Sequence, residues 1–199
     1  MSQWSQVCRE IVRRIVHLGT MQATANRLGL QRFMEVVWPR IIETNPRPPE
    51  LWVVGNLDGA SPELLGQLEK ANAICAGYVF DLGTVLRPYD IHIVPWEHDT
   101  GTRTRIPLAL NYAQALVSTR AGAACFRELR HNENCVQVDG LEQMGEAILA
   151  LVCDNIYRRQ LADAGRATFL RCYTREALQP RFDSFIKQVL RSNARASAL

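Results

Sequence analysis

The feature of this sequence that most constrains the fold is an alternation of short apolar runs with longer amphipathic stretches. The run at residues 51–54 is apolar at every position. A strand that buries both faces in this way is typical of a parallel sheet covered by helices. We predict strands at residues 14–19, 51–55, 73–77, 91–94, 115–118 and 135–138, and helices at 4–13, 26–43, 61–72, 80–88, 103–112, 123–130, 141–152, 156–170 and 175–190. This order predicts an α/β fold with a Rossmann-like, doubly wound parallel sheet.

The length predicts one compact unit. A chain of 199 residues with 47% apolar content can bury one good core. We expect an N-terminal helical segment at 1–14, one ligand-binding domain at 15–190 and a flexible tail at 191–199. Pro39 is expected to kink the helix in which it lies.

Composition and spacing exclude several classes of protein. The net charge of +3 and the scattered basic residues argue against binding to nucleic acid. The six cysteines contain no Cys-x-x-Cys pair and the four histidines have no zinc-ligand spacing, so we expect a reducing compartment and no metal site. No run approaches the roughly 20 apolar residues that a transmembrane helix needs. The sequence therefore predicts a cytoplasmic protein without a membrane span, which could work near a membrane surface.

Familiar nucleotide and hydrolase motifs are also missing. No Gly-x-Gly-x-x-Gly follows the first predicted strand, and neither a Gly-x4-Gly-Lys-Ser/Thr motif nor a Gly-x-Ser-x-Gly motif is present. A nicotinamide dinucleotide, a P-loop ATPase and an α/β hydrolase are therefore not supported.

One polar stretch, residues 95–105, has the composition of an anion-binding loop. It follows the predicted strand at 91–94, contains Gly101, and brings Arg103 and Arg105 to the start of the next predicted helix. Positive side chains at a helix N-terminus are unfavourable unless an anion lies nearby. Two interpretations stay open here: a phosphate loop, or a solvated helix start with both arginines in water.

Glycines follow most of the predicted strands. In a parallel sheet, the loops after the strands gather at one edge, where ligands bind. Glycine there allows the backbone to approach a ligand closely, although it serves equally well in tight turns. The glycines concerned are Gly19, Gly55, Gly77, Gly101 and Gly122.

Several phrases in this order resemble the C-terminal, donor-binding domain of a GT-B glycosyltransferase of group 1, also called family 4. The phrases are Val37-Trp-Pro-Arg-Ile41, Val53-Val-Gly55, Gly77-Tyr-Val-Phe-Asp81, Gly101-Thr-Arg-Thr-Arg-Ile106, Ala115-Leu-Val-Ser-Thr119 and Asn134-Cys-Val-Gln-Val-Asp139. The resemblance covers nearly all of the chain from Ile15 onward. It implies one half of a GT-B fold and a hexosyltransferase that uses a nucleoside diphosphate sugar, without a metal or other cofactor.

The resemblance also implies roles for individual residues. Arg103 and Arg105 would meet the donor diphosphate, and Asp99, with Glu97 and His98 beside it, would face the donor sugar. Tyr78 and Val79 would border the base, and Gly101, Thr102, Gly122 and Ala123 would offer backbone N–H groups to phosphate. Gly19 and Gly55 are the remaining donor-binding positions.

Two departures from the family pattern leave alternatives open. Leu108 stands where the family has the glutamate that holds the ribose, and its partner glutamate falls near Asp99 or Thr100. A GT-B site also lies between two domains, so a missing N-terminal acceptor domain or a partner chain would be needed. The alternatives are a catalytically inactive binding or scaffold module and, with less support, an epimerase of the same two-domain fold.

Overall fold

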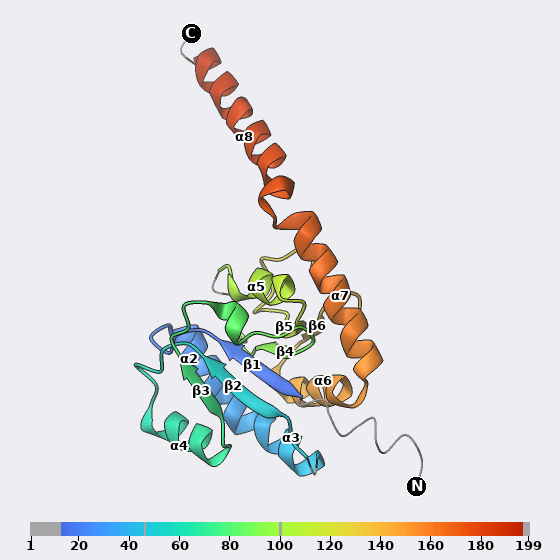
Figure 1. Ribbon diagram of the computed structural model, residues 1–199. Coiled ribbons are helices and arrows are strands. Elements are labelled where there is room, and N and C mark those ends of the chain that lie inside the picture. The colour runs from blue at the N-terminus through green and yellow to red at the C-terminus, as the bar shows by residue number, and fades with distance from the viewer. Residues whose placement is uncertain (1–12, 46, 100, 197–199) are drawn as a thin grey trace.

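The structure is a computed structural model that describes residues 13–45, 47–99 and 101–196. Its strands are β1 (Arg14–Leu18), β2 (Glu50–Val54), β3 (Ile74–Gly77), β4 (Ile91–Val94), β5 (Ala115–Thr119) and β6 (Val136–Val138). All neighbouring strands are parallel, and they form one sheet in the order β3-β2-β1-β4-β5-β6 (Figure 1). This confirms the predicted fold class. The helix predicted at 4–13 lies outside the described residues except for its last position.

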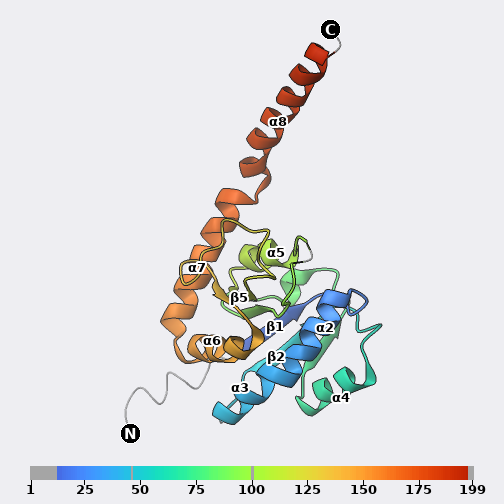
Figure 2. The same cartoon turned by 180° about the vertical axis from the view of Figure 1, so that it is seen from behind.

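Helices cover both faces of the sheet (Figures 1 and 2). The helices are α2 (Thr24–Arg32), η1 (Phe33–Val37), α3 (Trp38–Thr44), α4 (Pro62–Lys70), η2 (Leu82–Thr84), α5 (Arg105–Asn111), α6 (Leu141–Cys153), α7 (Asn155–Cys172) and α8 (Arg175–Ala196). On one face, Ile15, Val53 and Ile93 pack against α2, η1, α3, α4 and α6. On the other face, Leu116 packs against α5, while Val16 and Val54 pack beneath the segment between β3 and β4.

The strand order reverses direction between β1 and β4. From β1 the sheet grows through β2 to β3 on one side, and from β4 through β5 to β6 on the other. The two strands are in register, with Ile15 opposite Ile91. The helix after β1, α2, packs on one face of the sheet, and the helix after β4, α5, packs on the other face. Doubly wound sheets bind ligands at such a point, in the crevice outside the carboxyl ends of the strands.

Local rules explain most helix boundaries. Ser61 caps α4, because its Oγ accepts a hydrogen bond from the Leu64 N–H at 3.2 Å. Pro39 does not end its helix. A π-helical turn, η1, directly precedes it, and the Trp38 N–H donates to the Phe33 carbonyl. The wider turn accommodates a proline that has no N–H for the Glu35 carbonyl.

Two predicted helices are wrong. Residues 80–88 contain only η2, a short 3-10 turn in which the Asp81 carboxylate accepts from the Gly83 N–H at 2.9 Å. Residues 123–130 form successive turns, because the Phe126 N–H donates to Ala123 and the Leu129 N–H donates to Phe126. These three buried side chains are spaced by three residues, so separate turns bury them as well as a helix would.

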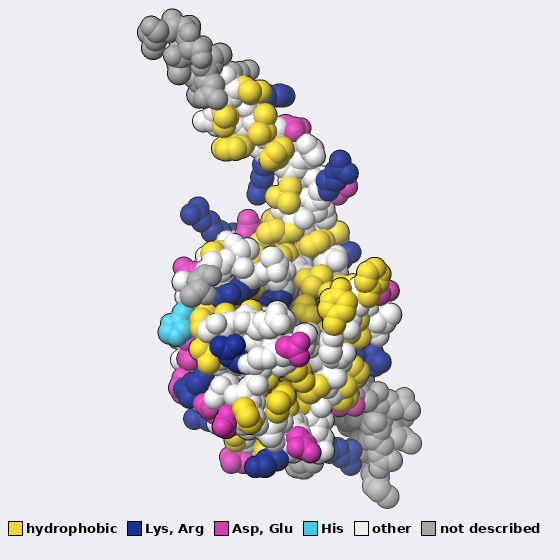
Figure 3. Space-filling model, turned by 90° about the vertical axis from the view of Figure 1, so that its left-hand side faces the viewer, with side chains coloured by type: hydrophobic (Ala, Val, Ile, Leu, Met, Phe, Trp, Pro, Cys, Tyr) yellow, Lys and Arg dark blue, Asp and Glu magenta, His cyan; other side chains and the backbone are white. Residues whose placement is uncertain are grey.

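The last helix leaves the domain and exposes an apolar side (Figure 3). It continues to Ala196, so residues 191–196 are helical and not part of the predicted flexible tail. Six apolar side chains on it are between 38% and 62% exposed: Leu178, Phe182, Phe185, Ile186, Val189 and Leu190. Among the described residues, no helix combines the length and apolar content that crossing a bilayer requires.

Candidate functional site

The loop between β4 and α5 is fixed to neighbouring elements by its own polar groups. The Thr119 hydroxyl, at the end of β5, donates to the Trp96 carbonyl. The Glu97 carboxylate accepts from the Leu141 N–H at 3.3 Å, at the start of α6, which has no cap from its own Gly140. Glu97 therefore caps α6, and its place beside the donor sugar stays a prediction.

Arg105 is the first residue of α5, and its side chain reaches the end of β1. Its Nη1 lies 3.3 Å from Nε2 of His17, and its Nη2 lies against Gly19. Arg105 makes no ion pair within the described residues. Burial, and secondly the charge of Arg103, lower the pKa of Arg105 to about 10. The guanidinium stays charged at neutral pH and lies in the crevice without a carboxylate to balance it.

His17 is the partner that orients Arg105. The side chain is completely buried, and its pKa lies well below the ordinary value because of burial and then the charges of Arg105 and His92. The neutral ring accepts the Arg105 N–H at Nε2, so its own proton is on Nδ1, which has no hydrogen-bond partner among the described residues. The position of His17 within an apolar strand pattern is typical of a core residue, so the sequence pattern does not predict this contact. Its place directly before the end of a strand was the available signal.

His92 is a core residue, as the sequence suggests. Its ring donates from Nδ1 to Oε1 of Gln114 at 2.9 Å. Burial lowers the pKa of His92 to about 4, and the hydrogen bond to Gln114 partly opposes the shift. The imidazole is therefore neutral at physiological pH.

Arg103 lies in the loop before α5, because the helix begins two residues later than its predicted start. Its guanidinium carbon lies 5.6 Å from the centre of the Trp96 ring. Burial lowers the pKa of Arg103, and the charge of Asp99 partly offsets that effect. Of the three residues predicted to be catalytic, Asp99 and Arg103 thus lie in the loop and Arg105 begins α5. The charge of Arg103 acts on Arg105, and that of Asp99 acts on Arg103. Since α5 has only seven residues, the arginines rather than the helix dipole supply the positive charge.

Gly19 and Gly55 pack on each other. Both have positive φ, at 146° and 133°, and a Cβ on Gly55 would lie 2.5 Å from the Gly19 carbonyl oxygen. Their N–H groups donate to the Val54 and Gly77 carbonyls, each at 2.8 Å. These glycines therefore serve the close approach of two strand ends, and they shape the crevice without leaving a free amide for a ligand.

The loop after β5 also uses its own amides. The Gly122 N–H donates to the Thr119 hydroxyl at 2.9 Å, and the Ala123 N–H donates to the Thr119 carbonyl at 3.1 Å. We expected these two amides to bind phosphate, but both already have partners within the loop. Gly101 and Thr102, by contrast, are exposed, and Gly101 has a φ of 92° with open space around its Cα.

The segment after β3 presents an apolar surface. Tyr78 is 80% exposed, whereas Val79 packs against the cluster of Val16, Val54 and Leu86, as Leu18, Leu82 and Leu108 do. Tyr78 and Val79 directly follow β3 at its carboxyl end, and their contact with a base stays a prediction.

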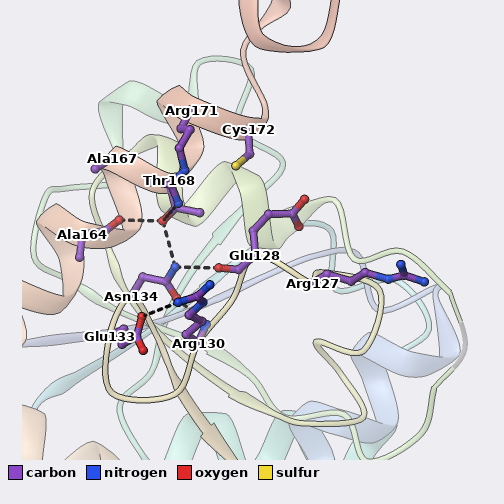
Figure 4. Close-up of a pocket in the computed structure, with 10 residues that line it drawn as sticks. All are labelled: Arg127, Glu128, Arg130, Glu133, Asn134, Ala164, Ala167, Thr168, Arg171 and Cys172. Carbon is purple, nitrogen blue, oxygen red and sulfur yellow. Dashed lines mark hydrogen bonds and ion pairs between the residues drawn. The ribbon is translucent and has the colours of Figure 1, made fainter. Parts of the chain in front are cut away.

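A pocket of about 630 Å³ lies elsewhere, between α7 and the turns before β6 (Figure 4). Its polar groups largely pair with one another: Asn134 donates to Thr168 at 2.9 Å and Arg130 is 3.5 Å from Glu133. None of the residues predicted for the donor site lines it. A smaller cavity of about 270 Å³ lies beside the β4–α5 loop, and its lining is Leu28, Gly29, Arg32, Pro95, Trp96, Glu97 and His98.

Several solved structures of glycosyltransferases share this fold. A glycosyltransferase from Rickettsia africae ESF-5 superposes with a TM-score of 0.72 at 14% identity, over 94% of this chain and 50% of that one. HepE from Anabaena, crystallised with UDP, superposes with a TM-score of 0.71 at 13% identity, over 92% of this chain and 51% of HepE. The C-terminal domain of LpcC, a group 1 glycosyl transferase from Francisella tularensis, superposes with a TM-score of 0.63 at 18% identity. The match covers 87% of this chain and 93% of the LpcC domain.

These likenesses concern the fold. The chain spans about half the length of the Rickettsia and Anabaena proteins, and nearly all of the isolated LpcC domain. A search of curated protein sequences finds no match.

The family described as glycosyl transferases group 1 matches residues 12–154, which include the whole sheet and the β4–α5 loop. That match covers most of the chain. The protein therefore belongs to the group 1 glycosyl transferases.

Proposed function

We propose that this chain binds the donor of a glycosyl transfer, a nucleoside diphosphate sugar, in the crevice between β1 and β4. The observation that carries the proposal is Arg105, a largely buried arginine without a carboxylate partner among the described residues, held by neutral His17. A buried cation of this kind is stabilised when an anion pairs with it. HepE, which shares the fold, was crystallised with UDP and with UDP-glucose, which supports a diphosphate as that anion.

The arrangement suggests how the leaving group would be stabilised. When the bond between the sugar and the diphosphate breaks, negative charge develops on the diphosphate oxygen. Arg105 and Arg103 would offset that charge, and fixed cations in a site that excludes water are effective at this. Asp99, beside Arg103, would face the sugar. The proposed transfer needs no metal ion.

Donor binding should raise the thermal stability of the chain. With UDP-glucose at about 100 times its Kd, linkage predicts about 2.7 kcal/mol of additional stability, seen as a melting temperature several degrees higher. Differential scanning fluorimetry with UDP-glucose and with UDP measures this. If no nucleoside diphosphate or its sugar raises the melting temperature at millimolar concentration, the inactive binding or scaffold module is the better description, and Leu108 would be its first explanation.

We also propose that α8 packs against a second α/β domain, supplied by a longer chain or by a partner chain. Two observations support this. The chain spans about half of the Rickettsia and Anabaena glycosyltransferases. In addition, α8 leaves the domain with Phe182 and Phe185 each 60% exposed. An apolar face of this kind is typical of a surface that another part of an assembly covers. That domain would supply the acceptor site.

The coding sequence upstream of Met1 tests this second proposal first. Where it encodes an α/β domain, hydrogen exchange of residues 178–190 should be slower in the longer chain than in the present one. Substitution of Phe182 and Phe185 by serine should remove that protection, whereas Ile156→Ser, on an exposed apolar residue of α7, should not. Equal exchange of α8 in both chains would contradict the proposal.

A further inference from the structure

An apolar side chain stands directly next to the proposed diphosphate position. Leu108 follows Arg105 by three residues in α5, so the two side chains share one side of the helix. Leu108 is partly buried and packs against the cluster of Val16, Val54 and Leu86, as Leu18 and Val79 do. The side chains that cover this cluster, between Arg105 and the loop after β3, are therefore largely apolar.

The position of this surface relates it to the donor. Arg105 lies against His17 and Gly19 at the end of β1, and Leu18 stands between these two residues. Val79 follows β3, on the far side of β2. A nucleoside diphosphate with its phosphates at Arg105 and its base at Val79 would place its ribose over Leu108.

Leucine neither donates nor accepts a hydrogen bond. A ribose hydroxyl set against it gives up its bonds to water without replacement, which is unfavourable. A site selects for a hydroxyl only where a polar group pairs with it. The carboxylate in the loop after β3, that of Asp81, accepts from the Gly83 N–H and holds the turn η2.

We infer that this site does not distinguish ribose from 2′-deoxyribose, so that it accepts 2′-deoxyribonucleoside diphosphate sugars as well as their ribose counterparts. Leu108 is the residue that sets this specificity. The inference rests on the proposed donor binding and adds to it the class of nucleoside that the site takes.

The experiment compares the Kd of UDP with that of dUDP by isothermal titration calorimetry. In the wild-type chain the two should agree within about threefold, with dUDP at least as tight. Leu108→Glu, which restores an acceptor for the hydroxyl, should favour UDP by about tenfold or more. Leu108→Met, of similar volume and without an acceptor, should keep the wild-type ratio. A glutamate at this position could also pair with Arg105 and weaken both nucleotides, but the ratio is independent of that effect.

The outcomes separate the inference from the function on which it rests. If wild-type protein binds UDP about tenfold more tightly than dUDP, and Arg105→Met weakens both, donor binding stands and the inference is overturned. If neither nucleotide nor inorganic pyrophosphate binds, both fail together. If circular dichroism shows that Leu108→Glu does not fold, the inference is tested on the wild-type chain alone. The ratio of the Kd values of UDP and dUDP is then measured again with GDP and dGDP, and a preference of about tenfold for the ribonucleotides overturns the inference.

Discussion

Replacing Arg105 with methionine is expected to weaken the binding of UDP about 10- to 150-fold, the equivalent of one charge-assisted hydrogen bond. Methionine keeps much of the length of the side chain and removes its charge. The loss of affinity is expected to be large because this guanidinium is mostly buried and donates to neutral His17 rather than to a carboxylate. Isothermal titration calorimetry with UDP and with pyrophosphate measures the effect.

Two further arginines make the result specific. Arg103→Met should have an effect of the same kind, because Arg103 lies two residues before Arg105 and its charge lowers the pKa of Arg105. Arg120→Met is the matched control. Arg120 follows β5 at the same edge of the sheet, but it is paired with Asp139 at 2.8 Å and is exposed. Equal affinity of wild type and an Arg103→Met/Arg105→Met double variant would refute the diphosphate assignment.

Replacing Arg14 with leucine is expected to destabilise the folded chain by about 3–5 kcal/mol at neutral pH, as removal of one partner of a buried ion pair does. Arg14 is 2% exposed. Its Nη2 donates to the Val85 carbonyl at 2.8 Å, its guanidinium lies 3.9 Å from the centre of the Trp52 ring, and its Nη1 lies 3.7 Å from the Asp90 carboxylate. The substitution leaves Asp90 buried without its cation. Urea unfolding measures the change.

The effect of Arg14→Leu should depend on pH. Burial raises the pKa of Asp90 to about 6, against the opposing charge of Arg14. Folding therefore favours protonated Asp90, and this contribution to stability is complete below the ordinary carboxyl pKa and lost as the pH rises through about 6. Arg14 attracts Asp90 only when the carboxylate is ionised. The stability gap between wild type and Arg14→Leu should be widest at about pH 8 and should narrow toward about pH 4.

A surface pair provides the control for this second prediction. Arg32 lies 3.2 Å from Glu35, with both side chains well exposed, so Arg32→Leu should change the free energy of unfolding by about 1 kcal/mol or less. Arg14 is the first residue of β1, whereas Arg105 lies at the carboxyl end of that strand. UDP should therefore still bind to folded Arg14→Leu protein. If the difference in unfolding free energy between wild type and Arg14→Leu does not vary with pH, Arg14 acts through packing on Trp52 alone.

Elements with a periodic or uniformly apolar pattern could be predicted from the sequence. The six strands begin and end within one residue of their predicted bounds, because a short apolar run marks each of them. The inner strands β1, β4 and β5 are buried on both faces, whereas the edge strand β3 is partly exposed. The helices at 80–88 and 123–130 are wrong for a related reason. A spacing of three residues buries the same side chains in successive turns as in a helix, so the pattern alone does not decide between them.

The same division holds for the site. The α/β fold and the segment that carries Asp99, Arg103 and Arg105 could be predicted, because adjacent residues and strand patterns encode them. The contacts across the sheet could not: that Arg105 meets His17, that Gly55 packs on Gly19, that the Gly122 and Ala123 amides have partners, and that Leu108 and Val79 pack against one buried cluster. His17 and Arg105 are 88 residues apart, and the order of strands in the sheet brings them together. A local pattern specifies which face of an element is buried, but not which distant side chain it meets there.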